Sequence, residues 1–174
     1  MSGARVRVHA GDLIQLPVDA IVNAANERLT PGGGVCGAIH RAAGPGLAEE
    51  CAKLGHCPTG EARITRGYRL PARHVIHAVG PIWQGGRRGE DDLLASCYRA
   101  ALRLAREQGI RTIAFAAIST GIYGFPLERA TRIAVETVRD CLGSEPGLEE
   151  VIFAAFGPEA EEAYERALAR ERDV

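Results

Sequence analysis

Hydrophobic and polar positions along the chain change between two periods, which predicts a succession of strands and helices. Apolar residues alternate with polar ones or form short unbroken runs in the segments 4–10, 19–25, 61–70, 73–80, 112–118 and 150–156. They recur at helical spacing in the segments 35–43, 46–54, 91–108, 127–142 and 158–172. Because strands that alternate with helices favour a parallel sheet covered on both faces, the pattern predicts an α/β sandwich with a mostly parallel central sheet.

The strand segments differ in a way that predicts their places in the sheet. Residues 4–10 alternate as a half-buried strand does, whereas 19–25 is continuously apolar, as in a strand covered on both faces. The segments 61–70 and 73–80 are expected to pair, with their turn at Pro71 and Ala72. Parallel sheets bind ligands at the carboxyl ends of their strands, so the loops after Ala25, Ile118 and Phe156 are the places to look for a site.

Two of these loops are rich in glycine and lead directly into helices. Asn26 and then Gly32–Gly34 follow the apolar run 19–25, and Ser119–Gly124 follows the run 112–118. Glycine lets backbone N–H groups approach a ligand closely, and helix N-termini add unpaired donors and a favourable dipole for an anion. One such loop is as consistent with a flexible connector as with a site. Two of them, both after buried strands, favour a site that grips a diphosphate.

Composition and charge narrow the class of protein. The net charge is −1, hydrophobic residues make up 46% of the chain, and no apolar run reaches a membrane-spanning length. The N-terminus lacks the apolar stretch of a signal peptide. We therefore expect a single domain over residues 1–174 in the cytoplasm, with no membrane partner and no strong binding to nucleic acid.

Cysteines and histidines do not indicate a metal centre. The five cysteines are odd in number and form no CxxC pair, which argues against a disulfide framework and a structural zinc site. A metal cluster could be formed by Cys51, His56 and Cys57, which are close in the sequence. The favoured interpretation is that the two cysteines are ordinary thiols at a helix end and in a loop. His77 lies in an apolar run and is predicted to be a hydrogen-bonded strand residue. We expect neither a metal nor a cofactor.

The glycine-rich loops match neither of two common nucleotide signatures. The chain has no GxxxxGK[ST] motif, which excludes a P-loop NTPase. The segment from Gly32 to Gly37 is not GxGxxG, and no acidic residue ends a strand about twenty residues further on. Redox chemistry with a nicotinamide cofactor is therefore disfavoured.

Three long segments, 11–45, 57–83 and 115–130, carry a resemblance to a known family. GDLIQLPVDAIVNAANERLTPGGGVCGAIHRAAGP, CPTGEARITRGYRLPARHVIHAVGPIW and FAAISTGIYGFPLERA resemble the macrodomain pattern, in particular its MacroD-type branch, which includes bacterial O-acetyl-ADP-ribose deacetylases. The resemblance runs from Val6 to about Tyr164. It implies a three-layer α/β/α fold with a mixed, mostly parallel sheet of about six strands, and ADP-ribose as the ligand.

The resemblance also implies roles for particular residues. Asp12 matches the acid that accepts a hydrogen bond from the adenine amino group, with the backbone of Leu13 beside it, although an aspartate here is also typical of a loop cap. Asn26 matches the contact to the distal ribose, and Asn23 a support for the loop. Phe156 matches an aromatic that stacks on adenine, and packing in the core is an equally weighted alternative. The two loops around the ribose and diphosphate comprise Gly32, Gly33, Gly34, Val35, Cys36, Ser119, Thr120, Gly121, Ile122, Tyr123 and Gly124, with Tyr123 closing over the site.

One departure from the family pattern bears on activity. MacroD-type hydrolases read GGGVDG, with an aspartate that orients the attacking water, where this chain has Cys36. A carboxylate is charged at pH 7, whereas a thiol at its reference pKa of about 8.5 is mostly neutral, so the cysteine is a poor general base.

Two functions follow from the resemblance. The first is hydrolysis of ADP-ribosyl carboxylate esters, in O-acetyl-ADP-ribose or on ADP-ribosylated proteins, with Asn26 and Cys36 as the catalytic candidates. A stand-alone chain favours this reading, because a binding module usually delivers an attached activity. The second is non-catalytic ADP-ribose binding, which Cys36 favours. A third reading, an RNA-associated regulator, has no basic stripe to support it.

Overall fold

The order of elements along the chain follows the predicted succession of strands and helices. A computed structural model of the chain describes residues 4–143 and 147–172, so the outermost ends of the predicted domain lie outside the described residues. The elements are β1 (Arg5–Ala10), β2 (Ala20–Ala24), α1 (Gly34–Ala43), α2 (Pro45–Leu54), β3 (Ala62–Arg66), β4 (His74–Ala78), α3 (Glu90–Glu107), β5 (Thr112–Phe115), α4 (Leu127–Leu142), β6 (Glu150–Ala155) and α5 (Pro158–Arg172).

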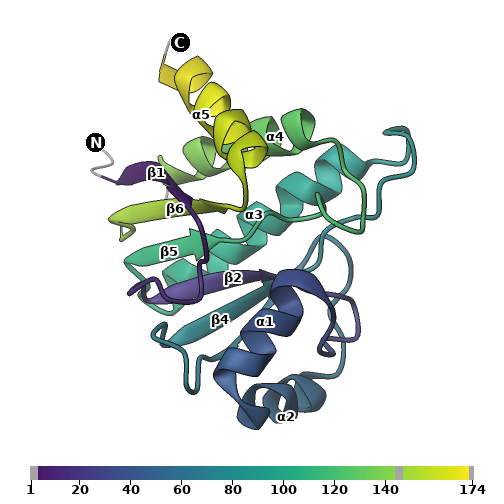
Figure 1. Cartoon of the computed structure of the whole chain (residues 1–174), viewed down its shortest axis with the longest axis vertical. Coiled ribbons are helices and arrows are strands. Elements are labelled where there is room, and N and C mark those ends of the chain that lie inside the picture. The colour runs from purple at the N-terminus through teal and green to yellow at the C-terminus, as the bar shows by residue number, and fades with distance from the viewer. Residues whose placement is uncertain (1–3, 144–146, 173–174) are drawn as a thin grey trace.

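The strands form one mixed, mostly parallel sheet in the order β1-β6-β5-β2-β4-β3. Only β3 and β4 pair antiparallel, and the other four pairings are parallel. Figure 1 shows α1 and α2 beside one end of this sheet, while α4 and α5 lie beside the other. The predicted α/β class and the sheet of about six strands are confirmed.

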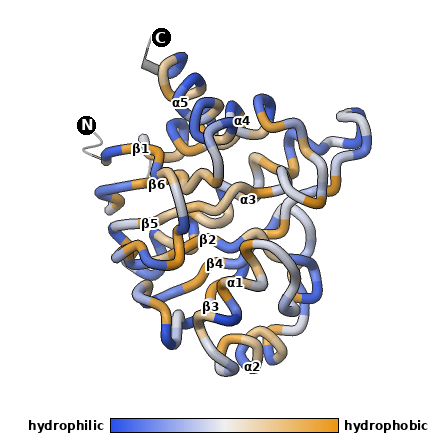
Figure 2. The backbone as a smooth tube through the Cα atoms, viewed as in Figure 1, coloured by the Kyte–Doolittle hydropathy of each residue, from blue (hydrophilic) through white to orange (hydrophobic). Residues whose placement is uncertain are grey.

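Alternation of side chains along the strands divides the core into two layers. In β2, Val22 packs into the layer that contains α3, α4 and α5, whereas Ile21 packs into the layer that contains α1 and α2. Four of the five β2 residues are buried, as expected for a central strand, while β1 at the edge alternates between exposed and half-buried positions. Figure 2 shows the amphipathic character of the helices, whose tubes change between blue and orange along their length.

The connection between β3 and β4 is longer than the sequence predicted. The strands end at Arg66 and begin again at His74, because the N–H of Gly67 donates to the carbonyl of Arg73 and that of Leu70 donates to Gly67. These two hydrogen bonds close a turn over the whole of residues 67–73. The predicted turn at Pro71 and Ala72 was therefore too short.

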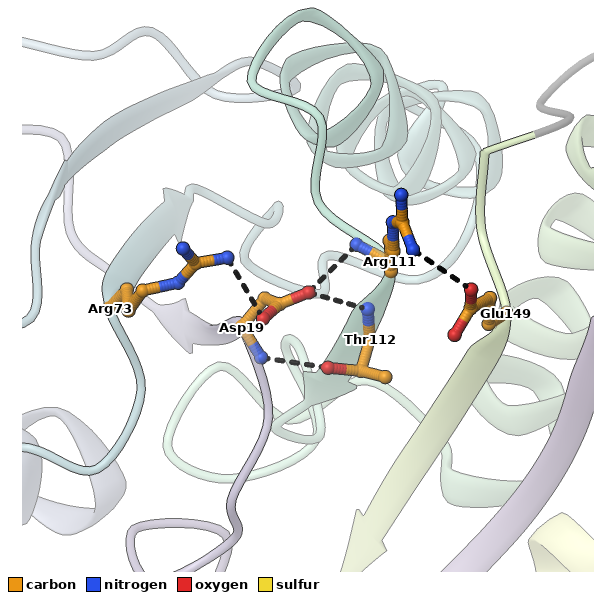
Figure 3. Close-up of polar contacts among 5 residues, drawn as sticks. All are labelled: Asp19, Arg73, Arg111, Thr112 and Glu149. Carbon is orange, nitrogen blue, oxygen red and sulfur yellow. Dashed lines mark hydrogen bonds and ion pairs between the residues drawn. The ribbon is translucent and has the colours of Figure 1, made fainter.

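A half-buried carboxylate ties together three segments at the amino ends of β2, β4 and β5. The Asp19 carboxylate accepts hydrogen bonds from the N–H groups of Arg111 and Thr112, at 2.9 and 3.2 Å, and from the Arg73 guanidinium at 3.1 Å (Figure 3). Its own N–H donates to the Thr112 hydroxyl at 2.8 Å. Burial raises the pKa of Asp19, but these donors lower it by more, so the net pKa is below its ordinary value.

Asp19→Asn should lower the free energy of unfolding by about 1.5–3 kcal/mol at pH 7, because charged hydrogen bonds are lost. Since the folded pKa lies below the unfolded one, this contribution is present above the unfolded pKa and is lost as the pH falls through the folded pKa. Urea unfolding at pH 7 and at acidic pH should show the difference from wild type shrinking with acid. Asp140→Asn, at an exposed position, is the matched control. Equal loss of stability in both variants at pH 7 would contradict a stabilising role for the Asp19 hydrogen bonds.

Candidate ligand-binding site

A cavity of about 350 Å³ opens at the carboxyl ends of β2, β4 and β5. Two loops supply most of its wall, and the rest comes from the ends of the strands. Its lining residues are Ala24, Ala25, Asn26, Gly32, Gly33, Gly34, Val35, Cys36, Gly80, Ala117, Ile118, Ser119, Gly121, Ile122 and Tyr123. The cavity therefore lies at the edge of the sheet where the sequence predicted a site.

The first loop, which leads from Asn26 to Gly34, is held in shape by hydrogen bonds and by a close backbone approach. The Asn26 side chain donates to the carbonyl of Thr30 at 2.9 Å and accepts from the Thr30 N–H at 3.1 Å. A Cβ at Gly37 would lie 2.3 Å from the carbonyl oxygen of Gly32, so only glycine lets the loop fold back on the first turn of α1. Contacts within the protein thus define the path of this loop.

The N-terminus of α1 forms one wall of the cavity. Gly33, Gly34 and Val35 line the cavity, and no described side chain caps the helix at Gly33. The first N–H groups of a helix have no partner within the helix, and the helix dipole adds positive character there. This wall can therefore accept an anion such as a phosphate.

The second loop faces the first across the cavity and has a strained residue at its start. Ser119 is buried with φ of 68°, an uncommon conformation outside glycine, and its hydroxyl donates to the carbonyl of Pro81 at 2.8 Å. The N–H of Phe125 donates to the carbonyl of Ser119, and the N–H of Gly124 donates to the carbonyl of Gly121. The exposed crest of the loop includes Ile122, which is 94% exposed. Uncommon backbone conformations are typical of ligand-binding loops.

Cys36 lies at the base of the first loop. Its side chain is buried at 6% exposure, and the Asn23 amide nitrogen lies 3.5 Å from its sulfur. Asn23 is completely buried, and the same nitrogen is 3.3 Å from Nδ1 of His77. The Asn23 side chain therefore lies between His77 on β4 and Cys36 in the first turn of α1.

His77 is a buried, neutral histidine. Desolvation, reinforced by the nearby His40, lowers its pKa to about 3. Its Nε2 lies 3.0 Å from the hydroxyl of Thr65 on the neighbouring strand β3. If the Asn23 amide nitrogen donates to Nδ1, the ring proton is on Nε2 and points to Thr65. The prediction of a hydrogen-bonded strand residue is confirmed.

Ten of the fifteen residues predicted for the site line the cavity, and the other five are not among its lining residues. Asp12 and Phe156 directly follow the paired ends of β1 and β6, where Ala10 is opposite Ala155. Asp12 is exposed, and its carboxylate accepts a hydrogen bond from the N–H of Ile14 at 2.9 Å, as a loop cap does. The residues outside the cavity lining are Asp12, Leu13, Thr120, Gly124 and Phe156.

The structure decides between the alternatives for Phe156. Its side chain is 69% exposed, so packing in the core is excluded. Leu13, in contrast, is buried at 1% exposure, so its side chain belongs to the core and only its backbone faces the surface loop. The exposed aromatic ring of Phe156, which follows the strand paired with the one before Asp12, is available to stack on a base.

Sequence reasoning missed five residues that line the cavity, which are Ala24, Ala25, Gly80, Ala117 and Ile118. Four of them are apolar and carry no reactive group, so no chemical signal marks them. Gly80 had a positional signal, since it follows the buried run 75–79. A Cβ there would lie 2.2 Å from the Ser119 hydroxyl, which explains the glycine.

Cys51 lies near the end of α2 and Cys57 in the loop that follows, as predicted, and both are buried. Burial raises the pKa of each thiol to about 11, so both are protonated at neutral pH. Within residues 4–143 and 147–172, no group of three or more His, Cys, Asp or Glu side chains could hold a metal ion. None of the described helices has the length and apolarity needed to cross a bilayer.

Comparison with known proteins identifies the family. The Macro domain family model matches residues 22–134, and a Macro domain-containing protein of Chlorobaculum tepidum is 60% identical over 94% of this chain and 96% of its own length. The chain belongs to the Macro domain family. An O-acetyl-ADP-ribose deacetylase of Escherichia fergusonii is 50% identical over 98% of both chains.

Solved structures agree with this assignment. The Oceanobacillus iheyensis macrodomain with ADP is 40% identical, with a TM-score of 0.89 over 95% of this chain and 90% of that one. The Trypanosoma brucei macrodomain in complex with ADP-ribose is 46% identical, also with a TM-score of 0.89, over 94% of this chain and 68% of that one.

Proposed function

We propose that the protein binds ADP-ribose and hydrolyses its carboxylate esters, either O-acetyl-ADP-ribose or ADP-ribosyl groups on the aspartate or glutamate side chains of proteins. The observation that carries the proposal is the cavity between two glycine-rich loops, each of which leads into a helix that no described side chain caps. The start of α1 and the backbone of the second loop both line the cavity, and backbone donors on two sides suit a diphosphate better than a neutral group. The relatives named as a deacetylase and as complexes with ADP and ADP-ribose support the same ligand.

The strand order supplies a direction for the ligand. Asp12 and Phe156 follow β1 and β6, the second loop follows β5, and Asn26 with Cys36 follows β2. Three strand intervals of about 4.8 Å make ~14 Å from β1 to β2, a span that an extended ligand with two nucleoside-like ends can cover. In this pose adenine lies at Asp12 and Phe156, the diphosphate between the loops, and the distal ribose at Asn26.

The reaction requires only water as a co-reactant. Water adds to the ester, and the products are ADP-ribose and a carboxylic acid, which ionises at neutral pH. The loops contribute by fixing the diphosphate, and Asn26 by fixing the distal ribose, so that the ester is held in place for attack. Asn26 lines the cavity, and two hydrogen bonds to the backbone of Thr30 fix its side-chain amide there.

A single-turnover assay on a peptide that carries ADP-ribosyl glutamate tests the hydrolase proposal. Release of free ADP-ribose above the rate without protein is the expected result, and O-acetyl-ADP-ribose serves as the second substrate. A non-catalytic ADP-ribose-binding module is the second candidate function, because Cys36 offers a thiol where a carboxylate would activate water. Tight binding of ADP-ribose with no release from either ester would favour that module.

Asp12→Ala should weaken ADP-ribose binding by about 1.5–3 kcal/mol, because a hydrogen bond to a charged acceptor is lost. The same carboxylate should make the protein prefer ADP-ribose over its guanine analogue, because guanine places an acceptor where adenine has its amino donor. Calorimetric titration with both ligands measures these differences. Asp12→Asn is the matched control, since its amide oxygen can still cap Ile14. Equal affinity for the two bases would remove the adenine assignment.

A further inference from the structure

The segment of residues 80–89 between β4 and α3, called the strap from here on, is folded around the buried carboxylate of the first residue of α3. The N–H groups of Gln84, Gly86 and Arg88 donate to the Glu90 carboxylate at 2.8, 2.9 and 2.7 Å. Glu90 itself is only 2% exposed. Burial raises its pKa, but these three backbone donors and the N–H of Glu90 itself lower it by more, and the net pKa is about 2. The strap therefore encloses a permanent negative charge at neutral pH.

A second set of contacts fixes the half-buried side chain of Trp83 beneath the strap, against the hydrophobic core. The Trp83 ring packs against Phe125 with 4.7 Å between ring centroids, and the Arg129 guanidinium lies 5.1 Å from the Trp83 ring centroid. Arg129 also makes two hydrogen bonds to the Asp91 carboxylate, at 2.8 and 2.7 Å. A Cβ at Gly86 would lie 2.7 Å from the Trp83 ring, so the strap fits closely over the indole.

The strap holds the second ligand loop at three points. The N–H of Trp83 donates to the carbonyl of Tyr123 at 2.8 Å. The carbonyl of Pro81 accepts a hydrogen bond from the hydroxyl of Ser119 at 2.8 Å. The third point is the packing of Phe125 on Trp83. Ser119, Tyr123 and Phe125 thus meet the strap at the start, the middle and the end of the loop.

We propose that Glu90 and Trp83 are positioning residues that hold the second loop in its ligand-binding shape. The inference rests on the proposed function and names the device that prepares the site for the diphosphate. A loop already ordered by the strap loses less conformational freedom when the ligand binds. The protein therefore binds ADP-ribose with higher affinity. Because coupling is reciprocal, ligand on the loop should in turn stabilise the strap, and Trp83 is placed to report this effect.

Glu90→Gln should reduce ADP-ribose affinity by roughly tenfold or more, because the amide replaces one acceptor oxygen with a donor that opposes the strap N–H groups. Asp92→Asn is the matched control, since it removes the same charge from an exposed position in the same first turn of α3. Calorimetry well below the melting temperature of each variant measures affinity apart from stability. If folded Glu90→Gln binds as tightly as Asp92→Asn, the positioning role is wrong.

Trp83 is the only tryptophan of the chain, so its fluorescence reports on the strap directly. In wild type, saturating ADP-ribose should shift the emission, whereas adenosine, which lacks the diphosphate, should leave it unchanged. If the strap has a merely structural role, the emission should be the same in the free protein, with ADP-ribose and with adenosine. An unchanged spectrum in saturating ADP-ribose would contradict the coupling.

Arg129→Ala decides the question if Glu90→Gln does not fold. This half-buried surface residue can be removed without opening the core, and several-fold weaker ADP-ribose binding with altered Trp83 emission is expected. Wild-type affinity in folded Arg129→Ala would then overturn the inference. Failure of the proposed function has a different signature, since wild type itself would show no binding of ADP-ribose, and the inference would fall with it.

Discussion

Cys36→Asp is expected to raise the rate of ADP-ribosyl ester hydrolysis at neutral pH by on the order of 10²–10⁴-fold, the usual contribution of a well-placed general base. Residue 36 lines the cavity at the base of the first loop, beside the proposed place of the distal ribose. The Asn23 amide nitrogen, now 3.5 Å from the Cys36 sulfur, is placed to donate to the new carboxylate and orient it. Affinity for ADP-ribose should change little or fall slightly, because the added charge lies near the diphosphate.

Single-turnover rates of four proteins separate the roles of the side chain at position 36. Cys36→Asn matches the shape of aspartate without its charge, and Cys36→Ala removes the thiol. If Cys36→Ala equals wild type and only Cys36→Asp is faster, the thiol takes no part and catalysis in wild type depends on the loops and the ligand. An inactive Cys36→Ala beside an active wild type would show that the thiol itself acts. If Cys36→Asp and wild type are both inactive while they bind ADP-ribose tightly, the hydrolase proposal fails for these esters.

Gly121→Glu is expected to abolish ADP-ribose binding and to leave the fold intact. Gly121 lines the cavity, and no described atom lies within 4 Å of a Cβ built on it, so the new side chain can enter the cavity without a clash. There its carboxylate would meet the diphosphate. Two unit charges about 4 Å apart near a protein surface repel by about 4 kcal/mol, which corresponds to roughly a thousandfold in affinity.

Calorimetry and thermal unfolding check the two halves of this prediction. Gly147→Glu is the matched control, because Gly147 is exposed, lies between α4 and β6, and also has open space for a Cβ. Both variants should unfold near the wild-type temperature, and only Gly121→Glu should lose binding. Normal ADP-ribose affinity in a folded Gly121→Glu would show that the second loop does not hold the diphosphate.

The positions of strands and helices could be predicted from the sequence because their periods are local. The continuous apolar run 19–25 became the central strand β2, and the alternating run 4–10 became the edge strand β1. The glycine-rich loops could be located for the same reason, since glycine at a strand end marks the backbone itself. Bounds were less certain where hydrogen bonds between distant residues decided them, as at Gly67 and Arg73.

What only the tertiary structure decided is which side chains meet. Glu90 begins a run of three acidic residues at a helix start, a pattern that the helix dipole alone explains, and only the fold shows its carboxylate enclosed by the strap. Phe156 was as consistent with the core as with the surface until its exposure was known. Gly80 and Ala117 line the cavity without any chemical mark.

The sequence by itself determined the elements and the two loops, because periodicity and glycine act on the local backbone. The partners of each side chain depend on the strand order β1-β6-β5-β2-β4-β3, which brings together segments that are far apart in the chain.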